Sequence, residues 1–162
     1  IPSDALEVHN EQLTAREISQ INAYRKARAV AKKLPDALVV GADTLVYLNG
    51  KVFGKPRDRA DAQRMLDELQ GETHQVVTGV CLVHLRKHRQ LVFAEMTDVT
   101  FRSLTSDQIE DYLATVNPLD KAGAYAIQES GDLLIHEISG SFSNVVGLPM
   151  ERLSVELELE AW

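Results

Sequence analysis

The feature that most constrains the fold is a predicted β-hairpin over residues 39–56, VVGADTLVYLNGKVFGKP. Its centre, Asn49-Gly50, is the strongest short-range signal for a two-residue turn, and apolar residues flank it on both sides. Because such a turn fixes the strand register, we expect the Asp43 carboxylate and the Lys55 ammonium to return to the same end of the sheet. An anionic substrate and a cation could lie between them. The alternative is a surface hairpin whose Asp and Lys are solvated.

The composition is that of one soluble globular domain, with 44% hydrophobic and 25% charged residues among 162. No apolar run approaches the roughly 18 residues of a membrane span, so we expect no membrane partner. A formal charge of −7 argues against a nucleic-acid partner. The net negative charge is still compatible with the binding of a small anion in one cleft, because nearby cations or a bound metal outweigh the effect of distant negative charges. The single Cys81 lies in an apolar run, which indicates a buried strand residue and a cytoplasmic setting.

Helix-start signals recur along the chain. Thr14 with Glu17 forms a capping box, and Thr105 with Gln108 forms a second one. Asp58 can cap a further helix with one apolar face. The predicted helices cover residues 15–33, 59–69, 106–116 and 150–157.

Alternating or continuous apolar runs predict further strands over residues 72–85, 91–102 and 133–138. Residues 119–128, LDKAGAYAIQ, mix charges with small residues and an aromatic, as loops that approach a ligand often do. Residues 139–149 form a connection rich in Gly, Ser and Asn. Helices interspersed among strands predict a mixed α/β sandwich or an α+β fold.

Five motifs occur in a fixed order: GADTLV, FGKP, GETHQVVTGV, DKAGAYAIQ and GSFSNVVGLPMERL. This series resembles the Maf family of nucleoside triphosphate pyrophosphatases. The resemblance implies an α/β fold with a mixed twisted sheet, flanking helices and two lobes around a cleft, related to the inosine triphosphate pyrophosphatases. It also implies a homodimer that cleaves the α–β phosphoanhydride of a nucleoside triphosphate with a divalent metal cation, Mg²⁺ or Mn²⁺.

The usual opening of that family, a first strand followed by a Ser-x-Ser-Pro-Arg-Arg loop, does not occur in this sequence. We therefore expect residues 1–162 to form a single pyrophosphatase domain that lacks its N-terminal strand and its Ser/Arg-rich loop. That loop is expected to contribute phosphate-binding side chains. Activity of the intact protein and activity of this chain are consequently separate questions.

The resemblance assigns catalytic and metal-binding roles to the first half of the chain. Asp43 matches the catalytic aspartate, as a general base or metal ligand for the attacking water. Glu7 resembles the acidic residue ahead of the first long helix and is a candidate second metal ligand, although exposed Glu residues are common. Lys26 in a Lys-Ala pair and Lys55 in GKP would hold phosphate as point charges. A solvated helix face would explain Lys26 equally well.

The DKAG loop supplies the remaining candidates. Asp120 could coordinate metal, and Lys121 could bind phosphate; the alternative is a salt bridge between the two. We assign Thr44 and Gln128 to base selection. The Gln amide offers a donor and an acceptor, which match the O4 acceptor and the N3–H donor of uracil or thymine and discriminate against cytosine. For His74 we expect a structural hydrogen bond rather than a catalytic role.

Within the family, Asp followed by Thr, with a Gln after the DKAG loop, looks like the dTTP/UTP subgroup. The 7-methyl-GTP subgroup typically has Gln after the Asp. The leading hypothesis is therefore a dTTP/UTP pyrophosphatase that could also accept modified pyrimidine nucleotides. The alternatives are the 7-methyl-GTP subgroup, a nucleotide-binding regulator of cell division or septum formation with little turnover, and a structural scaffold. A scaffold would leave the Asp43, Lys55 and Asp120-Lys121 constellation unexplained.

Overall fold

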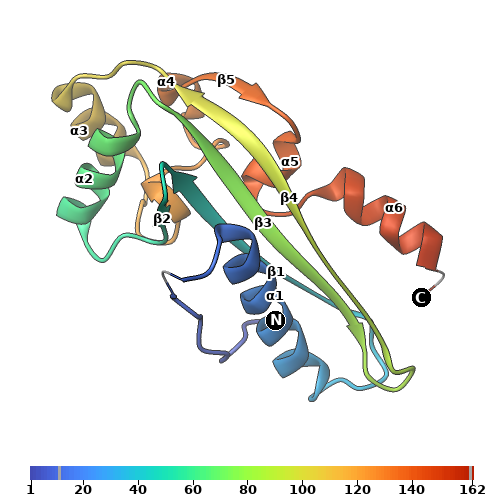
Figure 1. Cartoon of the computed structure of the whole chain (residues 1–162). Coiled ribbons are helices and arrows are strands. Elements are labelled where there is room, and N and C mark those ends of the chain that lie inside the picture. The colour runs from blue at the N-terminus through green and yellow to red at the C-terminus, as the bar shows by residue number, and fades with distance from the viewer. Residues whose placement is uncertain (11, 161) are drawn as a thin grey trace.

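A five-stranded sheet forms the centre of the molecule (Figure 1). The computed structural model describes residues 1–10, 12–160 and 162 of the chain. The strands lie in the order β2-β1-β3-β4-β5, and every pairing between them is antiparallel. They are β1 (Val39–Leu48), β2 (Lys51–Phe53), β3 (Thr73–His84), β4 (Arg89–Phe101) and β5 (Ile135–Ser139).

This pairing corrects the expectation of a mixed sheet. Strands β2 and β3 do run in the same direction, and helix α2 (Arg59–Leu69) connects them in the manner of a crossover. However, β1 lies between them and pairs with both, so no parallel pair forms among the described strands. Local patterns in a sequence indicate strands but do not say which strand is inserted between two others.

The predicted hairpin is confirmed. Asn49 and Gly50 have φ values of 49° and 87°, which is the pair of left-handed conformations that a two-residue primed turn requires. The return strand β2 is short and pairs with β1 only from Val46 to Leu48. Among the described pairings, the earlier part of β1 therefore has β3 on one side and no strand on the other.

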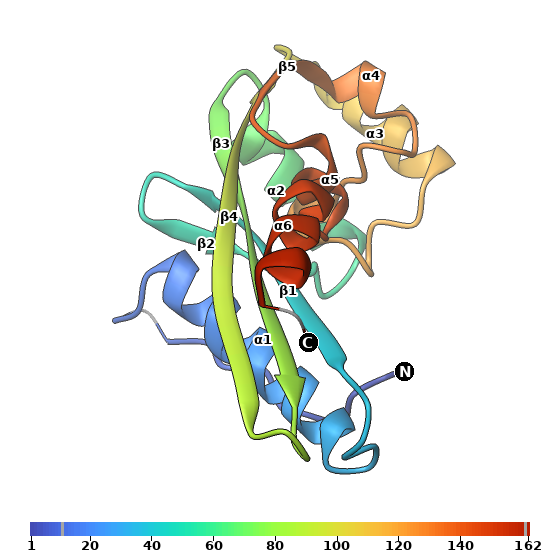
Figure 2. The same cartoon turned by 90° about the vertical axis from the view of Figure 1, so that its right-hand side faces the viewer.

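Helix α1 (Ala15–Ala31) covers one face of the sheet, while α5 (Phe142–Val146) and α6 (Met150–Glu160) lie on the other (Figure 2). The Thr14–Glu17 capping box opens α1 as predicted. The helix approaches β1 and β3 closely because glycines lie beneath it. A Cβ atom on Gly79 would lie 2.3 Å from the Ser19 carbonyl group, and one on Gly41 would lie 2.7 Å from the Ala23 carbonyl oxygen.

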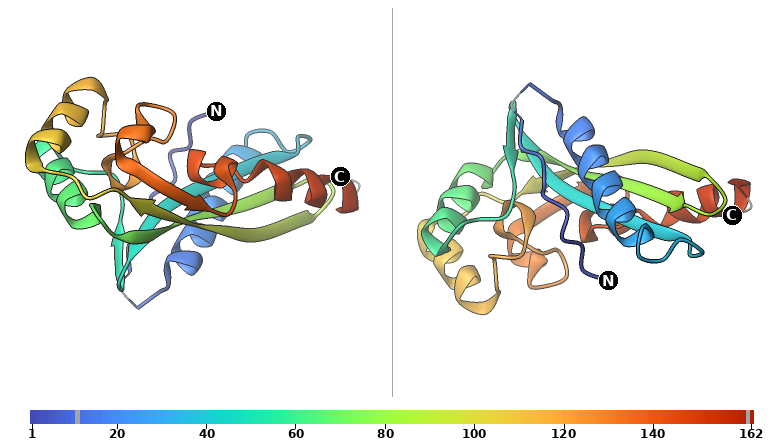
Figure 3. Two further views of the ribbon diagram at one scale, coloured as in Figure 1. Left: turned by 90° about the horizontal axis from the view of Figure 1, so that it is seen from above. Right: turned by 90° about the horizontal axis from the view of Figure 1, so that it is seen from below.

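The remaining helices gather at one end of the sheet (Figure 3). They are α2, α3 (Ser106–Thr115), α4 (Gly131–Leu134) and the 3₁₀ turn η1 (Ala122–Ala124). Asp58 and the Thr105–Gln108 capping box begin α2 and α3 as predicted. Phe53, Leu66 and Tyr112 are among the buried residues that join these elements in the largest hydrophobic cluster.

Two segments differ from the sequence-based expectation. The predicted strand over 133–138 is the single turn α4 followed by β5. The predicted connection over 139–149 contains α5, which the Ser141 hydroxyl caps at the Asn144 N–H. Both helices are too short to establish a 3.6-residue apolar period, which is the pattern that identifies longer helices. No helix in the described part of the chain is both long and apolar enough to cross a membrane.

Candidate functional site

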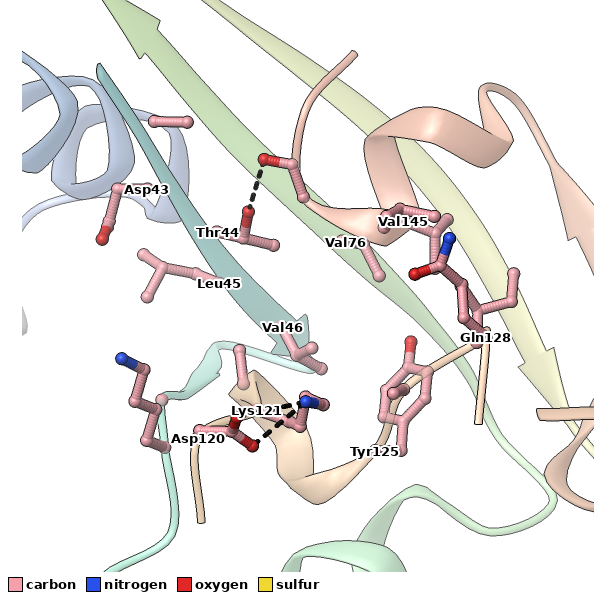
Figure 4. Close-up of a pocket in the computed structure, with 18 of the residues that line it drawn as sticks. Asp43, Thr44, Leu45, Val46, Val76, Asp120, Lys121, Tyr125, Gln128 and Val145 are labelled. Carbon is pink, nitrogen blue, oxygen red and sulfur yellow. Dashed lines mark hydrogen bonds and ion pairs between the residues drawn. The ribbon is translucent and has the colours of Figure 1, made fainter. Parts of the chain in front are cut away.

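A cavity of about 320 Å³ opens beside the free edge of β1 (Figure 4). Its wall includes all eight residues that the sequence nominated. These are Glu7, Lys26, Asp43, Thr44, Lys55, Asp120, Lys121 and Gln128. The structure thus brings together residues from the N-terminal segment, α1, the hairpin and the DKAG loop; their individual roles stay predictions.

The open edge explains how neighbouring strand residues enter one cavity. Successive side chains of a strand point to opposite faces of its sheet. Asp43 accordingly meets α1, whereas the Thr44 hydroxyl meets Thr78 and the loop after α5. Because β2 stops short of this part of β1, a cavity at the edge can be bordered by both faces.

The Asp43 carboxylate is buried and receives a donor on each oxygen. Lys26 Nζ donates to Oδ1 at 2.5 Å, and Asn22 Nδ2 donates to Oδ2 at 3.1 Å. The same ammonium lies 2.7 Å from Glu7 Oε1, so it bridges two carboxylates. Burial opposes the charge on Lys26, but the hydrogen bonds to Asp43 and Glu7 outweigh it and raise the Lys26 pKa. The hydrogen bond from Lys26 is also the main cause that lowers the pKa of Glu7.

Asn22 is a site residue that the sequence reasoning missed. Besides donating to Asp43, its side-chain oxygen accepts a hydrogen bond from the Val8 N–H at 2.7 Å. A signal was available, because Asn22 and Lys26 are four apart in a helix and therefore share a face. His9 also lines the cavity beside Glu7, although no spacing in the sequence identified it.

The DKAG loop places a second lysine between two carboxylates. Lys121 Nζ lies 3.1 Å from an Asp120 oxygen and 3.3 Å from Glu129 Oε1. The Asp120–Lys121 salt bridge weighed as an alternative is thus present, and Glu129 extends it. Desolvation opposes the ammonium, but the hydrogen bonds to Asp120 and Glu129 outweigh it and raise the Lys121 pKa. In the described residues, Lys55 is in no such ion pair; it lines the cavity, and its charge is one of the causes that lower the pKa of Glu7.

The two residues assigned to base selection differ in their hydrogen bonds. The Thr44 hydroxyl lies 2.9 Å from the Thr78 hydroxyl and 3.5 Å from the Gly147 carbonyl oxygen. Figure 4 shows the Gln128 side chain near Val145, on the side of the cavity away from Asp43. Within the described part of the chain, the Gln128 amide has no hydrogen-bond partner, so its donor and acceptor are available to a ligand.

His74 supports the cavity wall from behind. Its Nε2 lies 2.8 Å from the hydroxyl of Tyr125, whose ring lines the cavity, and the Phe101 ring packs edge-on against both rings. Burial lowers the His74 pKa to about 4, so the imidazole is neutral at pH 7. The expected structural hydrogen bond is confirmed.

Comparison with known proteins identifies relatives of the whole chain. The sequence model of a family described as Maf-like protein matches residues 1–160. The chain belongs to the Maf family. A dTTP/UTP pyrophosphatase of Acetivibrio thermocellus is 46% identical, in an alignment that covers 94% of this Maf chain and 79% of the relative. A dTTP/UTP pyrophosphatase of Moorella thermoacetica is 53% identical over 86% of this chain and 74% of its own length.

The carboxylates of this Maf protein suit a hard cation only in part. Glu7 and Asp43 both contact one ammonium, which shows that their oxygens converge on a position suited to positive charge. No group of three His, Cys, Asp or Glu side chains in the described residues is arranged to hold a metal, so Asp120 does not complete a three-carboxylate set. Mg²⁺ is commonly held by one or two carboxylates together with substrate phosphates and water. Glu7 and Asp43 fit a metal that is held in this way.

Proposed function

We propose that this protein is a nucleoside triphosphate pyrophosphatase that hydrolyses dTTP and UTP to the monophosphate and pyrophosphate. The observation that carries the proposal is the convergence of Asp43, Glu7 and the three lysines on one cavity. The names of the relatives support the same activity. Thr44, where the 7-methyl-GTP subgroup typically has Gln, supports the pyrimidine specificity.

Phosphoanhydride hydrolysis requires a positioned water and neutralisation of charge on phosphate oxygens. Asp43 supplies the first, because each of its oxygens has one donor and retains a second acceptor position for a water proton. A divalent metal bound by Glu7 and Asp43 would supply further charge neutralisation and lower the pKa of the attacking water.

The lysines supply the phosphate contacts. Lys55 is the ammonium without a carboxylate partner in the described structure, so it can bind a phosphate without first breaking an ion pair. Lys121 can also bind phosphate if it exchanges part of its contact with Asp120 or Glu129. Lys26 donates a hydrogen bond to the Asp43 carboxylate and stabilises the charge that develops beside it.

Base selection falls to the other side of the cavity. The free Gln128 amide can donate to O4 and accept from N3–H of thymine or uracil. Either protein partner of the Thr44 hydroxyl can take its single proton, which leaves a lone pair for a ligand donor. Cytosine presents a donor in place of O4 and lacks the N3–H, so it would leave these groups unpaired.

Several finer features belong to the proposal on the strength of the resemblance. They are the two-lobed arrangement of the inosine triphosphate pyrophosphatases, the homodimer and the use of Mg²⁺ or Mn²⁺. The cytoplasmic location also belongs to the proposal, on the strength of the single Cys81. Sedimentation of the purified protein tests the dimer directly. A monomer at micromolar concentration would contradict it.

The activity is tested by incubating the protein with a panel of nucleoside triphosphates and Mg²⁺ or Mn²⁺ and measuring pyrophosphate. We expect release from dTTP and UTP, and a loss of about 10³-fold or more in Asp43→Asn, which keeps the shape but not the charge. No release from any nucleotide, or release unchanged by Asp43→Asn, would overturn the proposal. Tight triphosphate binding without product would favour the regulatory alternative.

A further inference from the structure

We propose that Asn22 is a positioning residue that sets the arrangement of Asp43 relative to Glu7. The inference rests on the proposed function, because it concerns the same site. Asn22 is almost fully buried, at 1% exposure, and its amide touches two segments that are remote from it in the chain. One is the β1 strand at Asp43, and the other is the N-terminal segment at Val8.

The amide can bind both segments in only one orientation. Its oxygen accepts from the Val8 N–H at 2.7 Å, while its nitrogen donates to Asp43 Oδ2 at 3.1 Å and to the Val8 carbonyl oxygen at 3.4 Å. A flipped amide would face the Asp43 carboxylate with an oxygen and the Val8 N–H with a donor. The hydrogen-bonding groups on either side therefore fix the side chain.

The contact with Val8 controls Glu7, which is the preceding residue. The Glu7 carboxylate contacts Lys26 Nζ at 2.7 Å. Its backbone belongs to a segment that forms neither helix nor strand. Asn22 holds both the N–H and the carbonyl of Val8, much as a neighbouring strand would. Without the two bonds at Val8, the segment keeps the hydrogen bond from Arg25 to the Leu6 carbonyl oxygen at 3.3 Å, so the backbone that carries Glu7 is held before this residue but not after it.

Asn22 and Lys26 each donate a hydrogen bond to a different oxygen of Asp43. Lys26 supplies a charge to Oδ1, while Asn22 supplies a neutral donor to Oδ2 and so fixes the rotation of the carboxylate. Neither the phosphate contact assigned to Lys55 nor the base contact assigned to Gln128 involves Asn22. Loss of Asn22 should consequently affect turnover far more than substrate binding.

The test compares Asn22→Ala and Asn22→Asp with the matched control Ser19→Ala. Ser19 is also buried on α1, but its hydroxyl donates only to Arg16 O within the helix. We expect Asn22→Ala to lower kcat for dTTP by about 10- to 100-fold with KM changed by less than about 3-fold. Hydrogen exchange at the Val8 amide should become at least about 10-fold faster in the same variant. Ser19→Ala should change neither quantity.

Asn22→Asp separates the two contacts. It keeps an acceptor for the Val8 N–H but replaces the donor to Asp43 with a like charge, so the Val8 amide should stay protected while kcat falls as far as in Asn22→Ala. The exchange measurement needs no substrate and tests the positioning even if the proposed activity fails. Unchanged Val8 exchange in Asn22→Ala, a kcat equal to that of Ser19→Ala, or a KM that rises as much as kcat falls would each overturn the inference.

Discussion

At the scale of single residues, the site combines groups held by charge with one group left free. Lys26 and Lys121 each lie between two carboxylates, so both are ion-paired before a substrate arrives. The Gln128 amide has no such partner among the described residues. An unpaired amide in a cavity can recognise a base, because it forms its hydrogen bonds with the ligand and not with the protein.

Exchange of the Gln128 amide for a carboxylate should change the preferred base. Gln128→Glu loses the donor for O4 and gains an acceptor suited to the N4 amino group of cytosine. We expect kcat/KM for dTTP to fall by about 100-fold and the ratio of dCTP to dTTP hydrolysis to rise. Gln128→Leu serves as the control, because it removes both groups and should lower dTTP hydrolysis without favouring dCTP. An unchanged dCTP to dTTP ratio in Gln128→Glu would remove Gln128 from base selection.

His74 should make stability depend on pH. Its pKa is about 4 in the folded protein and 6.5 in the unfolded chain, so the unfolded state binds the proton first as pH falls. The stabilisation is complete above pH 6.5 and decreases towards pH 4, by on the order of 3 kcal/mol. His74→Gln keeps a polar partner for Tyr125 but does not titrate. Denaturant unfolding from pH 7 to 4 should therefore show a smaller loss for the variant than for the wild type, and equal losses would contradict the assignment.

At the scale of elements, the approach of α1 to the sheet positions Asn22 and Lys26 over Asp43. Gly79 pairs with Asp43 across β1 and β3, directly beneath the Ser19 carbonyl group. The helix can therefore come down onto the strands at the level of the site. A side chain at Gly79 would displace the helix that carries both donors of Asp43.

Gly79→Ala should accordingly destabilise the protein and impair the site together. The added Cβ would lie 2.3 Å from backbone atoms of Ser19, which no side-chain rotation relieves. We expect a loss of about 2–3 kcal/mol in the free energy of unfolding, measured by denaturant titration. Gly54→Ala is the control, since its Cβ would meet nothing within 4 Å, and it should cost less than about 1 kcal/mol. Comparable losses in the two variants would rule out the steric explanation.

The sequence predicts those elements whose signals are local. Capping boxes mark the starts of α1 and α3, and Asn49-Gly50 marks the hairpin. The prediction of a mixed sheet was wrong. The insertion of β1 between β2 and β3 depends on contacts between remote strands, which no local pattern reveals. The five-residue helix α5 was missed because it is shorter than the two turns that establish a period.

The site follows the same division. Residues inside recognisable motifs, such as Asp43 and Lys55, were nominated and do line the cavity. Asn22 and Glu129 were missed, because each acts by contacting another side chain. Asn22 meets Asp43 on β1, and Glu129 meets Lys121 earlier in the same segment. The spacing of Asn22 and Lys26 shows that the two residues share a helix face, but it does not show that this face meets Asp43.

At the scale of the whole molecule, the formal charge of −7 coexists with three lysines around one cavity. Screening at physiological salt limits surface interactions to about 8 Å, so a small anion in the cavity responds mainly to the local cations. A polyanion that extends over the surface would meet the net negative charge instead. The protein should therefore distinguish a triphosphate from a nucleic acid by size.

We expect no binding of a duplex oligonucleotide at physiological salt. The chain has 24 acidic and 17 basic residues, and two of the cavity lysines are already paired with carboxylates. Fluorescence anisotropy of a labelled duplex should show no change up to about 10 µM protein, the range of ordinary non-specific binding. A rise in anisotropy that disappears as salt increases would contradict this.

The free edge of β1 separates the groups assigned to hydrolysis from those assigned to base preference. Asp43 and Thr44 are joined by one peptide bond, yet one faces α1 and the other faces the loop after α5. Hydrolysis is assigned to the first environment and base preference to the second, so the two are separated by the thickness of a strand. We therefore expect variation in α5 and its loop to alter which nucleotide is accepted while the groups assigned to water positioning stay in place. A library confined to residues 142–147 is therefore the place to select new base preferences without rebuilding the chemistry.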